Sequence, residues 1–407
     1  MEEWKSYKLC ELCDIHRGSS PRPIQKYLSN AGQPWVKISD ATSDDSRYIT
    51  GTKEYIIPDG IRHSVIVKPG TLIVSNSATP GLPKIMKIEA CVHDGWLIID
   101  KVKPQVLKEF LYYTFVLIRK ELSNQANGSV FQNLKTDIVK NFEIKVPSIQ
   151  IQQKIVSILG TIEDKLEINN SINHNLEQQA QALYKSWFVD FEPFKDGKFV
   201  ESDMGLIPEG WRVGILSELG DIVAGGTPSK TRPDYYTDNG IAWLTPKDLS
   251  IKCNKFTAKG EIDITETGYK NSSAKLMPKG SVLFSSRAPI GYITIAKNDI
   301  CTNQGFKSVV PTYAGTAYIY YWLSCNTENI EAQASGSTFK EASGALMKSF
   351  PALVPPKDIL KSFEKELKPI LRKQELIEEE SSNAEQMRDI LLPRLMSGEF
   401  VFDGLTC

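Results

Sequence analysis

One pattern occurs twice in this chain of 407 residues. Gly18-Ser-Ser-Pro21, followed by Trp35-Val-Lys-Ile-Ser-Asp40, returns as Gly225-Gly-Thr-Pro228, followed by Trp243-Leu-Thr-Pro-Lys-Asp248. The copies lie 207 positions apart at the first motif and 208 at the second. This period is far longer than the roughly 20–50 residues of solenoid or propeller units. We therefore expect two related domains that contact two similar but non-identical targets.

Further shared positions extend the repeat. Gly70 and Gly81 match Gly280 and Gly291, and Gly128-Ser-Val-Phe131 matches Gly336-Ser-Thr-Phe339. Shared glycines and prolines predict shared turns, whereas the residues between them differ. Residues 1–147 form the first copy and residues 204–355 the second, with helical segments at 148–203 and 356–407.

Each copy is predicted to be a mixed, strand-rich α/β domain. Short apolar runs at 71–74, 96–99 and 281–284 are bounded by Gly, Pro, Asn or Asp, as is typical of strands between turns. Each copy also holds an aromatic-rich stretch with helical character, at 106–122 and 317–326. The pattern favours an irregular α/β domain over a doubly wound sheet.

The segments between and after the copies show coiled-coil spacing. Apolar or small polar residues recur in steps of four and three, which is the pattern of a helix–helix seam. An amphipathic helix packed on its own domain is the alternative, and Pro369 is expected to kink or delay the second helix. We expect the two helices to pair antiparallel. The seam residues are Leu159, Ile162, Leu166, Asn169, Asn173, Leu176 and Leu183 in the first helix and Leu367, Ile370, Ile377 and Ala384 in the second.

Charge and cysteine content narrow the class of protein. Residues 1–147 hold 20 Lys and Arg against 16 Asp and Glu, and residues 204–355 hold 15 against 13, although the whole chain has a net charge of −1. Positive copies suit contact with phosphate, and negative helices suit contact with protein. Seven cysteines, no signal-peptide pattern and no apolar run near ~18 residues favour a cytoplasmic protein. A zinc site at Cys10, Cys13, Cys91 and His93 is the weaker alternative to free thiols.

The sequence contains no recognisable catalytic motif. Val354-Pro-Pro-Lys357 lacks the amide and the aromatic side chain of an adenine methyltransferase loop, and Gly225-Gly-Thr-Pro-Ser-Lys230 lacks the second glycine of a phosphate loop. Carboxylate–lysine pairs such as Glu143 and Lys145 form no acid cluster that could hold a metal. We therefore expect no catalytic residues and no bound metal in this chain.

The repeated loops contain side chains suited to DNA. Arg and Lys can bind guanine or phosphate, Asn can bind adenine, and hydroxyl groups can bind phosphate or either base. Ordinary turn chemistry is the alternative for each single residue. The candidate DNA-binding residues are Ser19, Ser20, Arg22, Lys26, Lys37, Ser75, Asn76 and Ser77 in the first copy and Thr227, Ser229, Lys230, Arg232, Lys247, Ser285, Ser286 and Arg287 in the second.

At this point the whole chain resembles the specificity (S) subunits of Type I restriction–modification enzymes. The resemblance rests on the order copy, helix, copy, helix, on the string Leu176-Glu-Gln-Gln-Ala-Gln-Ala-Leu-Tyr-Lys-Ser-Trp-Phe-Val-Asp-Phe-Glu-Pro193 and on Leu391-Leu-Pro-Arg-Leu-Met-Ser-Gly-Glu-Phe400. Gly205-Leu-Ile-Pro-Glu-Gly-Trp211 is similar to the start of a target-recognition domain, and Gly225-Gly-Thr-Pro-Ser229 matches the early loop better than Gly18-Ser-Ser-Pro21 does.

The resemblance implies a non-catalytic recognition subunit. Each copy would bind one half of a bipartite, asymmetric sequence in double-stranded DNA, and the helices would set the spacing and bind two methylation (M) subunits. S-adenosylmethionine, ATP and Mg would belong to those subunits and to the restriction and translocation (R) subunits, with no membrane involved. A stand-alone methyltransferase or nuclease and a coiled-coil adaptor with two protein-binding heads are the alternatives.

Overall fold

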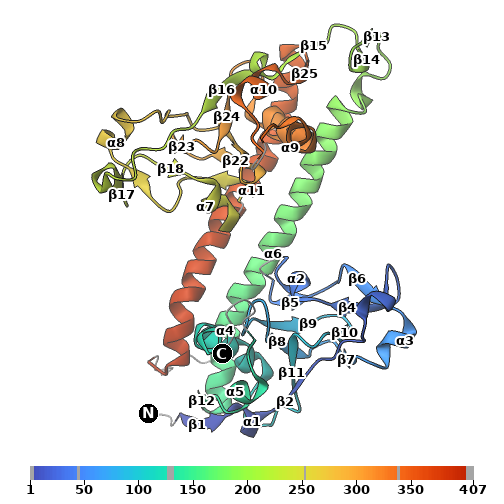
Figure 1. Cartoon of the computed structure of the whole chain (residues 1–407), viewed down its shortest axis with the longest axis vertical. Coiled ribbons are helices and arrows are strands. Elements are labelled where there is room, and N and C mark those ends of the chain that lie inside the picture. The colour runs from blue at the N-terminus through green and yellow to red at the C-terminus, as the bar shows by residue number, and fades with distance from the viewer. Residues whose placement is uncertain (1–3, 44–45, 126–132, 252–253, 337–339, 400–407) are drawn as a thin grey trace. The chain divides into compact units, whose positions relative to one another are not determined.

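The protein is described by a computed structural model that covers residues 4–43, 46–125, 133–251, 254–336 and 340–399 (Figure 1). The chain divides into two compact units, residues 1–168 with 381–407 and residues 169–380. Each unit therefore holds one copy of the repeat together with part of both long helices. The matched strings Gly128-Ser-Val-Phe131 and Gly336-Ser-Thr-Phe339 fall wholly or mostly outside the described residues.

The first copy contains short strands and short helices around one longer helix. Its strands are β1 (Lys5–Lys8), β2 (Asp14–Arg17), β3 (Leu28–Ser29), β4 (Gln33–Val36), β5 (Tyr48–Ile49), β6 (Glu54–Ile56), β7 (Val65–Val67), β8 (Leu72–Ser75), β9 (Pro83–Met86), β10 (Ala90–Val92), β11 (Trp96–Asp100) and β12 (Glu143–Val146). Its helices are α1 (Leu9–Leu12), η1 (Ile24–Lys26), α2 (Ile38–Ala41), α3 (Pro58–Ile61), α4 (Lys108–Asn124) and α5 (Thr136–Lys140).

The second copy follows the same plan. Its strands are β15 (Arg212–Ile215), β16 (Gly220–Ala224), β17 (Tyr236–Thr237), β18 (Trp243–Leu244), β19 (Phe256–Thr257), β20 (Asp263–Ile264), β21 (Val282–Ser286), β22 (Ile290–Ala296), β23 (Cys301–Thr302), β24 (Lys307–Pro311) and β25 (Pro351–Val354). Its helices are η3 (Leu216–Glu218), η4 (Pro233–Tyr235), α7 (Pro246–Ile251), α8 (Glu266–Lys270), α9 (Thr316–Gln333) and α10 (Gly344–Ser349).

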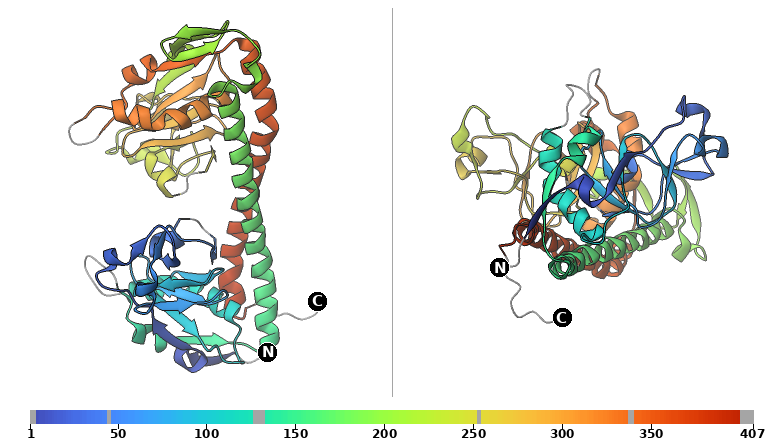
Figure 2. Two further views of the ribbon diagram at one scale, coloured as in Figure 1. Left: turned by 90° about the vertical axis from the view of Figure 1, so that its right-hand side faces the viewer. Right: turned by 90° about the horizontal axis from the view of Figure 1, so that it is seen from below.

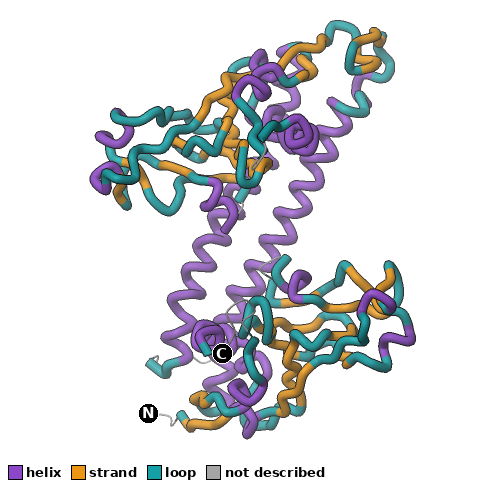
Figure 3. The backbone as a smooth tube through the Cα atoms, viewed as in Figure 1, coloured by secondary structure: helices purple, strands orange, loops and turns teal. Residues whose placement is uncertain are grey.

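One five-stranded sheet repeats between the copies, whereas the first copy's second sheet, β3-β6-β4-β10-β7, corresponds to the separate strand pairs β17-β20 and β18-β23 in the second copy. A five-stranded sheet has the order β2-β11-β8-β9-β5 in the first copy and β16-β24-β21-β22-β19 in the second. In both, the last pair is parallel and the others are antiparallel. A two-stranded ribbon, β1-β12 or β15-β25, joins the start of each copy to its end. Figure 3 shows these short strands among long loops, so the predicted mixed, strand-rich domain is confirmed.

Two helices of 40 residues each, α6 (Ile149–Phe188) and α11 (Lys357–Met396), run from one unit into the other. After α6 the chain forms η2 (Glu192–Phe194) and the hairpin β13 (Phe199–Ser202)–β14 (Gly205–Pro208). The expectation that Pro369 delays the second helix is wrong, because α11 is already helical from Lys357. Pro369 and Lys365 are both exposed, so the carbonyl group that loses its N–H partner can be hydrated.

Within the first unit the helices pair antiparallel (Figure 2). Leu159 of α6 packs in one core with Leu392 of α11, and four residues further along α6 Glu163 accepts a hydrogen bond from Arg388, four residues earlier in α11. The same core includes Leu9 and Phe110 of the first copy. The helix ends are therefore part of the first domain's interior.

The second unit shows the same antiparallel pairing. The rings of Tyr184 and Phe363 lie 6.1 Å apart, and Gln374 donates to Glu177 at 3.0 Å. All eleven predicted seam residues are buried or half-buried in the unit to which they belong, including Asn169, which is 1% exposed. The four-and-three spacing thus falls on residues that are shielded from solvent, and their contact across a helix–helix seam stays a prediction.

Candidate nucleic-acid interface

Equivalent strand pairs bring two distant loops together in each copy. β10 lies parallel to β4 with Cys91 opposite Trp35, and β23 lies parallel to β18 with Cys301 opposite Trp243. The residues that follow each cysteine lie against the repeated loop, which is residues 18–21 in the first copy and 225–228 in the second. Gly18 donates its N–H to the carbonyl of Trp96 at 2.9 Å, and Gly225 donates to that of Phe306 at 3.3 Å.

Close backbone packing explains why glycine occupies both positions. A Cβ atom at Gly18 would collide with the carbonyl oxygen of His93, and one at Gly225 would collide with that of Asn303. The loop would have to move away from the strand to accept any larger residue. The repeated glycine therefore fixes the distance between the loop and the strand end in each copy.

In each copy a side chain also stabilises the turn that follows the parallel strand, at residues 93–95 and 303–305. His93 accepts the N–H of Gly95 on Nδ1 at 2.7 Å, and Asn303 accepts that of Gly305 on Oδ1 at 2.8 Å. Burial lowers the pKa of His93, which agrees with a neutral ring that accepts at Nδ1. The two copies thus share one backbone frame while they use different side chains to hold it.

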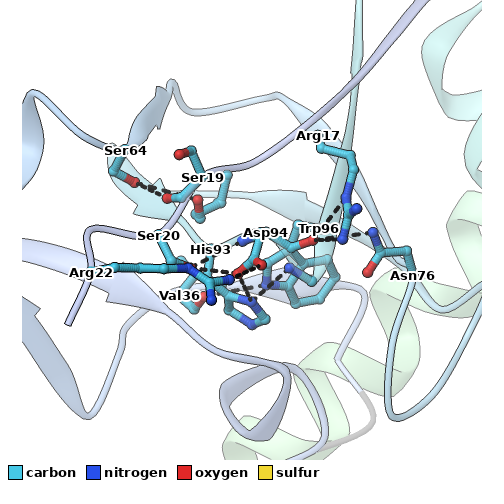
Figure 4. Close-up of polar contacts among 12 residues, drawn as sticks. Arg17, Ser19, Ser20, Arg22, Val36, Ser64, Asn76, His93, Asp94 and Trp96 are labelled. Carbon is cyan, nitrogen blue, oxygen red and sulfur yellow. Dashed lines mark hydrogen bonds and ion pairs between the residues drawn. The ribbon is translucent and has the colours of Figure 1, made fainter. Parts of the chain in front are cut away.

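Asp94 lies at the centre of the first frame (Figure 4). Its Oδ1 accepts from the Ser20 hydroxyl at 2.6 Å, and its Oδ2 lies 3.2 Å from Arg22 Nη2. Its carbonyl oxygen accepts from Arg17 Nη2 at 2.7 Å and from Asn76 Nδ2 at 3.2 Å. Partial burial raises the pKa of Asp94, but hydrogen bonds from Ser20 and from its own backbone N–H, together with the charge of Arg22, lower it below its usual value overall.

Gln304 occupies the equivalent point of the second copy. Each of Asp94 and Gln304 stands three residues after the cysteine that pairs with the repeated tryptophan. The Thr227 hydroxyl donates to Gln304 Oε1, just as the Ser20 hydroxyl donates to Asp94. A hydroxyl group and an acceptor therefore meet at the same place in both copies, but the acceptor is anionic in the first and neutral in the second.

A pocket opens beside each of these contacts. The first has a volume of about 510 Å³ and the second about 570 Å³. Seven predicted residues line them, namely Ser19, Ser20 and Arg22 in the first pocket and Thr227, Lys230, Lys247 and Arg287 in the second. The sequence interpretation missed Tyr27, Arg62, His63 and Ser64 in the first and Tyr236, Trp243, Asn303 and Gln304 in the second.

The sequence repeat extends to the segments that contain Asp94 and Gln304. Cys91-Val-His-Asp-Gly95 and Cys301-Thr-Asn-Gln-Gly305 share a cysteine and a glycine at an offset of 210, and each is followed by an aromatic residue. Extending the repeat to this segment would have placed Asp94 and Gln304 beside the loops.

Four predicted residues lie inside the domains instead of at their surfaces. Ser75 and Ser285 bond to the carbonyl groups of Thr79 and Pro289, and Ser286 bonds to that of Gly305. Asn76 is 1% exposed. Ser75, Asn76, Ser285 and Ser286 therefore shape the ends of β8 and β21, because their polar groups satisfy buried backbone. Ser77, the next residue, is half-buried.

Predicted residues at the surface, two of which also line the second pocket, have acidic neighbours in several cases. Lys37 pairs with Glu54, Lys247 pairs with Glu261 at 3.1 Å, and Arg232 forms two hydrogen bonds with Asp234. Such exposed pairs are weak and exchange readily for other partners. Lys26, Ser229 and Lys230 are exposed. Contact of all these residues with DNA stays a prediction.

Arg287 has a partner within its own domain. Its Nη1 lies 3.4 Å from Glu341 Oε2, and Lys307 Nζ lies 3.1 Å from Oε1 of the same carboxylate. Arg287 also lines the second pocket and is 36% exposed. Arg287 and Glu341 thus form an ion pair within one domain, and this pair leaves part of the guanidinium group exposed to the pocket.

Across the described ranges, no group of three or more His, Cys, Asp or Glu side chains is placed to hold a metal ion. Cys10 is exposed, and Cys13 and Cys91 are buried thiols. Among the described helices, none has both the length and the apolar character needed to span a bilayer.

Two related domains, each with a hydroxyl–acceptor contact at a matched strand end and a polar pocket beside it, together with helices that pair antiparallel in each unit, define a binding protein with two similar binding domains. The chain belongs to the family of the Type I restriction modification DNA specificity domain, whose model matches residues 1–178 and again residues 208–386. The two matches cover both copies of the repeat.

Relatives and a solved structure agree with this assignment. The chain is 27% identical to the Type I restriction enzyme MjaIX specificity subunit of Methanocaldococcus jannaschii, over 99% of this chain and 95% of that protein. It is 26% identical to the HindI specificity subunit of Haemophilus influenzae, over 98% and 100%. The crystal structure of the S subunit from M. genitalium shares the fold with a TM-score of 0.61 and 15% identity, over 97% of this chain and 96% of that one.

Proposed function

We propose that this chain is the DNA specificity subunit of a Type I restriction–modification complex. Each copy binds one half of a bipartite, asymmetric target in double-stranded DNA. The observation that carries the proposal is the duplicated backbone frame, which holds different polar side chains in the two copies, Ser20 with Asp94 against Thr227 with Gln304. Two similar heads with different hydrogen-bonding groups suit two different short sequences.

The charge distribution supports a nucleic-acid partner. Lys and Arg outnumber Asp and Glu by 20 to 16 in the first copy and by 15 to 13 in the second. Exposed cations that line the pockets, such as Arg62 and Lys230, are suited to phosphate contacts, which supply a large share of the affinity for DNA. We propose that this chain recognises the DNA sequence and does not itself catalyse a reaction.

The long helices are the proposed surface for two methylation subunits. Their outward positions include exposed apolar side chains at Ile168, Leu376, Met387 and Ile390, which would be covered by a partner. S-adenosylmethionine would then be bound by those subunits, and ATP and Mg by the restriction and translocation subunits that complete the complex.

The test is selection of duplexes from a random pool by the purified chain at several salt concentrations. A specificity subunit should enrich one motif of two unlike halves at fixed spacing, and its affinity should fall steeply with salt. An adaptor protein would enrich no sequence. A stand-alone methyltransferase would bind S-adenosylmethionine without partners, which calorimetry on the same preparation detects.

A further inference from the structure

Asp94 and Gln304 are matched in position and opposed in chemistry. An ionised carboxylate only accepts hydrogen bonds, whereas a primary amide both donates and accepts. Both follow the short parallel strand of their copy, and both touch the repeated loop through a hydroxyl group. If the two copies distinguish different bases, this is the position at which the distinction is built into one frame.

Both side chains retain hydrogen-bonding capacity toward solvent. The side chain of Asp94 is 42% exposed, and its two oxygens have about four acceptor sites, of which Ser20 and Arg22 occupy two. Gln304 is exposed, and its Nε2 has no hydrogen-bond partner among the described residues. A base edge could therefore bind either group without breaking the contact to the loop.

An acidic side chain beside a pocket that Arg22 and Arg62 line needs an explanation. It repels phosphate, so at a DNA surface it is useful only toward a donor on a base. The Asp94 backbone is held by Arg17 and Asn76 through its carbonyl group, and these bonds do not use the carboxylate. The Ser20 hydroxyl needs only an acceptor, and in the second copy the neutral amide of Gln304 accepts the equivalent hydroxyl of Thr227. The pair with Arg22 is exposed and therefore weak, so anchoring of the loop does not require the negative charge.

We propose that residues 94 and 304 determine base specificity in the two half-sites, where Asp94 accepts from the N4 amino group of a cytosine and Gln304 forms the two-bond contact with an adenine. The assignment follows from the donor and acceptor pattern of each base in the major groove. It rests on the proposed function and names the reading positions within it. Arg22, whose side chain is 80% exposed beside Asp94, is placed to donate to the guanine paired with that cytosine.

The test exchanges the chemistry while it preserves the shape. Asp94→Asn keeps an acceptor for Ser20 and adds the amide that favours adenine, and Gln304→Glu makes the reverse change in the second copy. Glu143→Gln removes one exposed carboxylate of the first copy on β12, outside the first pocket, and serves as the matched charge control. Duplexes are selected from a random pool by each full-length variant, and unfolding is followed on the same samples.

Asp94→Asn should replace cytosine by adenine at one position of one half-site, with roughly tenfold or greater discrimination against the old base. Gln304→Glu should replace adenine by cytosine in the other half-site, and Glu143→Gln should leave the motif unchanged. A bipartite wild-type motif that both exchange variants reproduce without change would overturn this inference and leave the proposed function standing. A wild-type chain that enriches no bipartite motif would overturn both. If Asp94→Asn unfolds, the exposed Gln304 variant alone decides.

Discussion

Glu341 holds two cations at once, and this arrangement decides what the loss of one of them should do. Lys307, whose side chain is 12% exposed, and Arg287 approach different oxygens of the carboxylate. Removing Arg287 leaves Glu341 paired with the more buried Lys307. The domain should therefore keep its stability, because partly exposed ion pairs contribute only about 0–1 kcal/mol.

We expect Arg287→Ala to weaken specific DNA binding by roughly 1–3 kcal/mol and to relax one base position in the second half-site. Lys230→Ala, from the rim of the same pocket, should weaken binding equally on all sequences and reduce the salt dependence, since a phosphate contact carries no sequence information. Titrations of target and scrambled duplexes at several salt concentrations separate the two. A lower unfolding temperature with an unchanged base preference would show that Arg287 only supports its own domain.

For single residues, the sequence predicted which loops carry the pocket-lining side chains better than it predicted whether a side chain is buried or exposed. Ser19, Ser20, Arg22, Thr227 and Lys230 do line the pockets, because the repeat marks the loop that carries them. Polar residues at the ends of strands proved ambiguous, because a buried backbone needs hydroxyl and amide partners just as a ligand does. Asp94 is not among the predicted residues, because the prediction favoured cations and hydroxyl groups that can bind phosphate.

Each recognition domain is anchored on the helices by a basic residue at an equivalent position, just before β5 or β19. Arg47 reaches Tyr113 Oη at 3.4 Å and pairs with Asp164 of α6, while Lys255 contacts Tyr321, Glu177 of α6 and Gln374 of α11. The heptad spacing predicted a row of shielded positions on each helix, but it could not predict the contacts of Arg47 and Lys255, because these residues lie far from the helices in sequence. The helix surfaces therefore pair with each other and with their domains.

Two glutamates of α6 should respond to pH with opposite sign. Burial raises the pKa of Glu177, but Lys255 lowers it below 4.5 overall, so ionised Glu177 stabilises the protein above about pH 4.5 and this contribution is lost as the pH falls through the lowered pKa. Burial raises the pKa of Glu163 above 4.5 despite Arg388, so its ionisation opposes folding at neutral pH and this cost disappears as the pH falls through the raised pKa.

Glu177→Gln should therefore destabilise the second unit at pH 7 by about 2 kcal/mol, less than the ~3–5 kcal/mol of a fully buried pair because a quarter of the Glu177 side chain is exposed. The deficit should shrink below pH 4.5. Glu163→Gln should instead show its most favourable difference from wild type at pH 7. Unfolding temperatures of both variants and the wild type from pH 3.5 to 7.5 measure these differences, and parallel curves for the two variants would contradict the assignment.

For the whole molecule, the proposed role of the helices as a spacer makes a geometric prediction. Deleting the seven residues Leu166–Ile172 removes one heptad of α6 and keeps the seam in phase, at about 1.5 Å per residue. We expect a shorter gap between the half-sites and unchanged half-site sequences, as determined by selection from random duplexes. Altered half-sites across an unchanged gap would contradict the spacer role.

The duplicated frame also predicts that recognition is modular. Replacing residues 1–147 with the corresponding domain of a related subunit should change one half-site and leave the other as in the wild type. Retaining Arg47 in the graft preserves the anchor to Asp164 and thereby the attachment to α6. A graft that changes both half-sites would mean that the copies do not bind DNA independently.

The core of the first unit has a consequence for biosynthesis. Leu392, Leu395 and Met396 pack in one core with Leu9, Leu12 and Phe110, although nearly the whole chain separates the two groups. When the ribosome has synthesised residues 1–168, the C-terminal side chains that complete this core are therefore still missing. The first domain must wait for the second to be synthesised, with an apolar surface open to chaperones. Premature termination near residue 380 would thus harm the domain that is translated first.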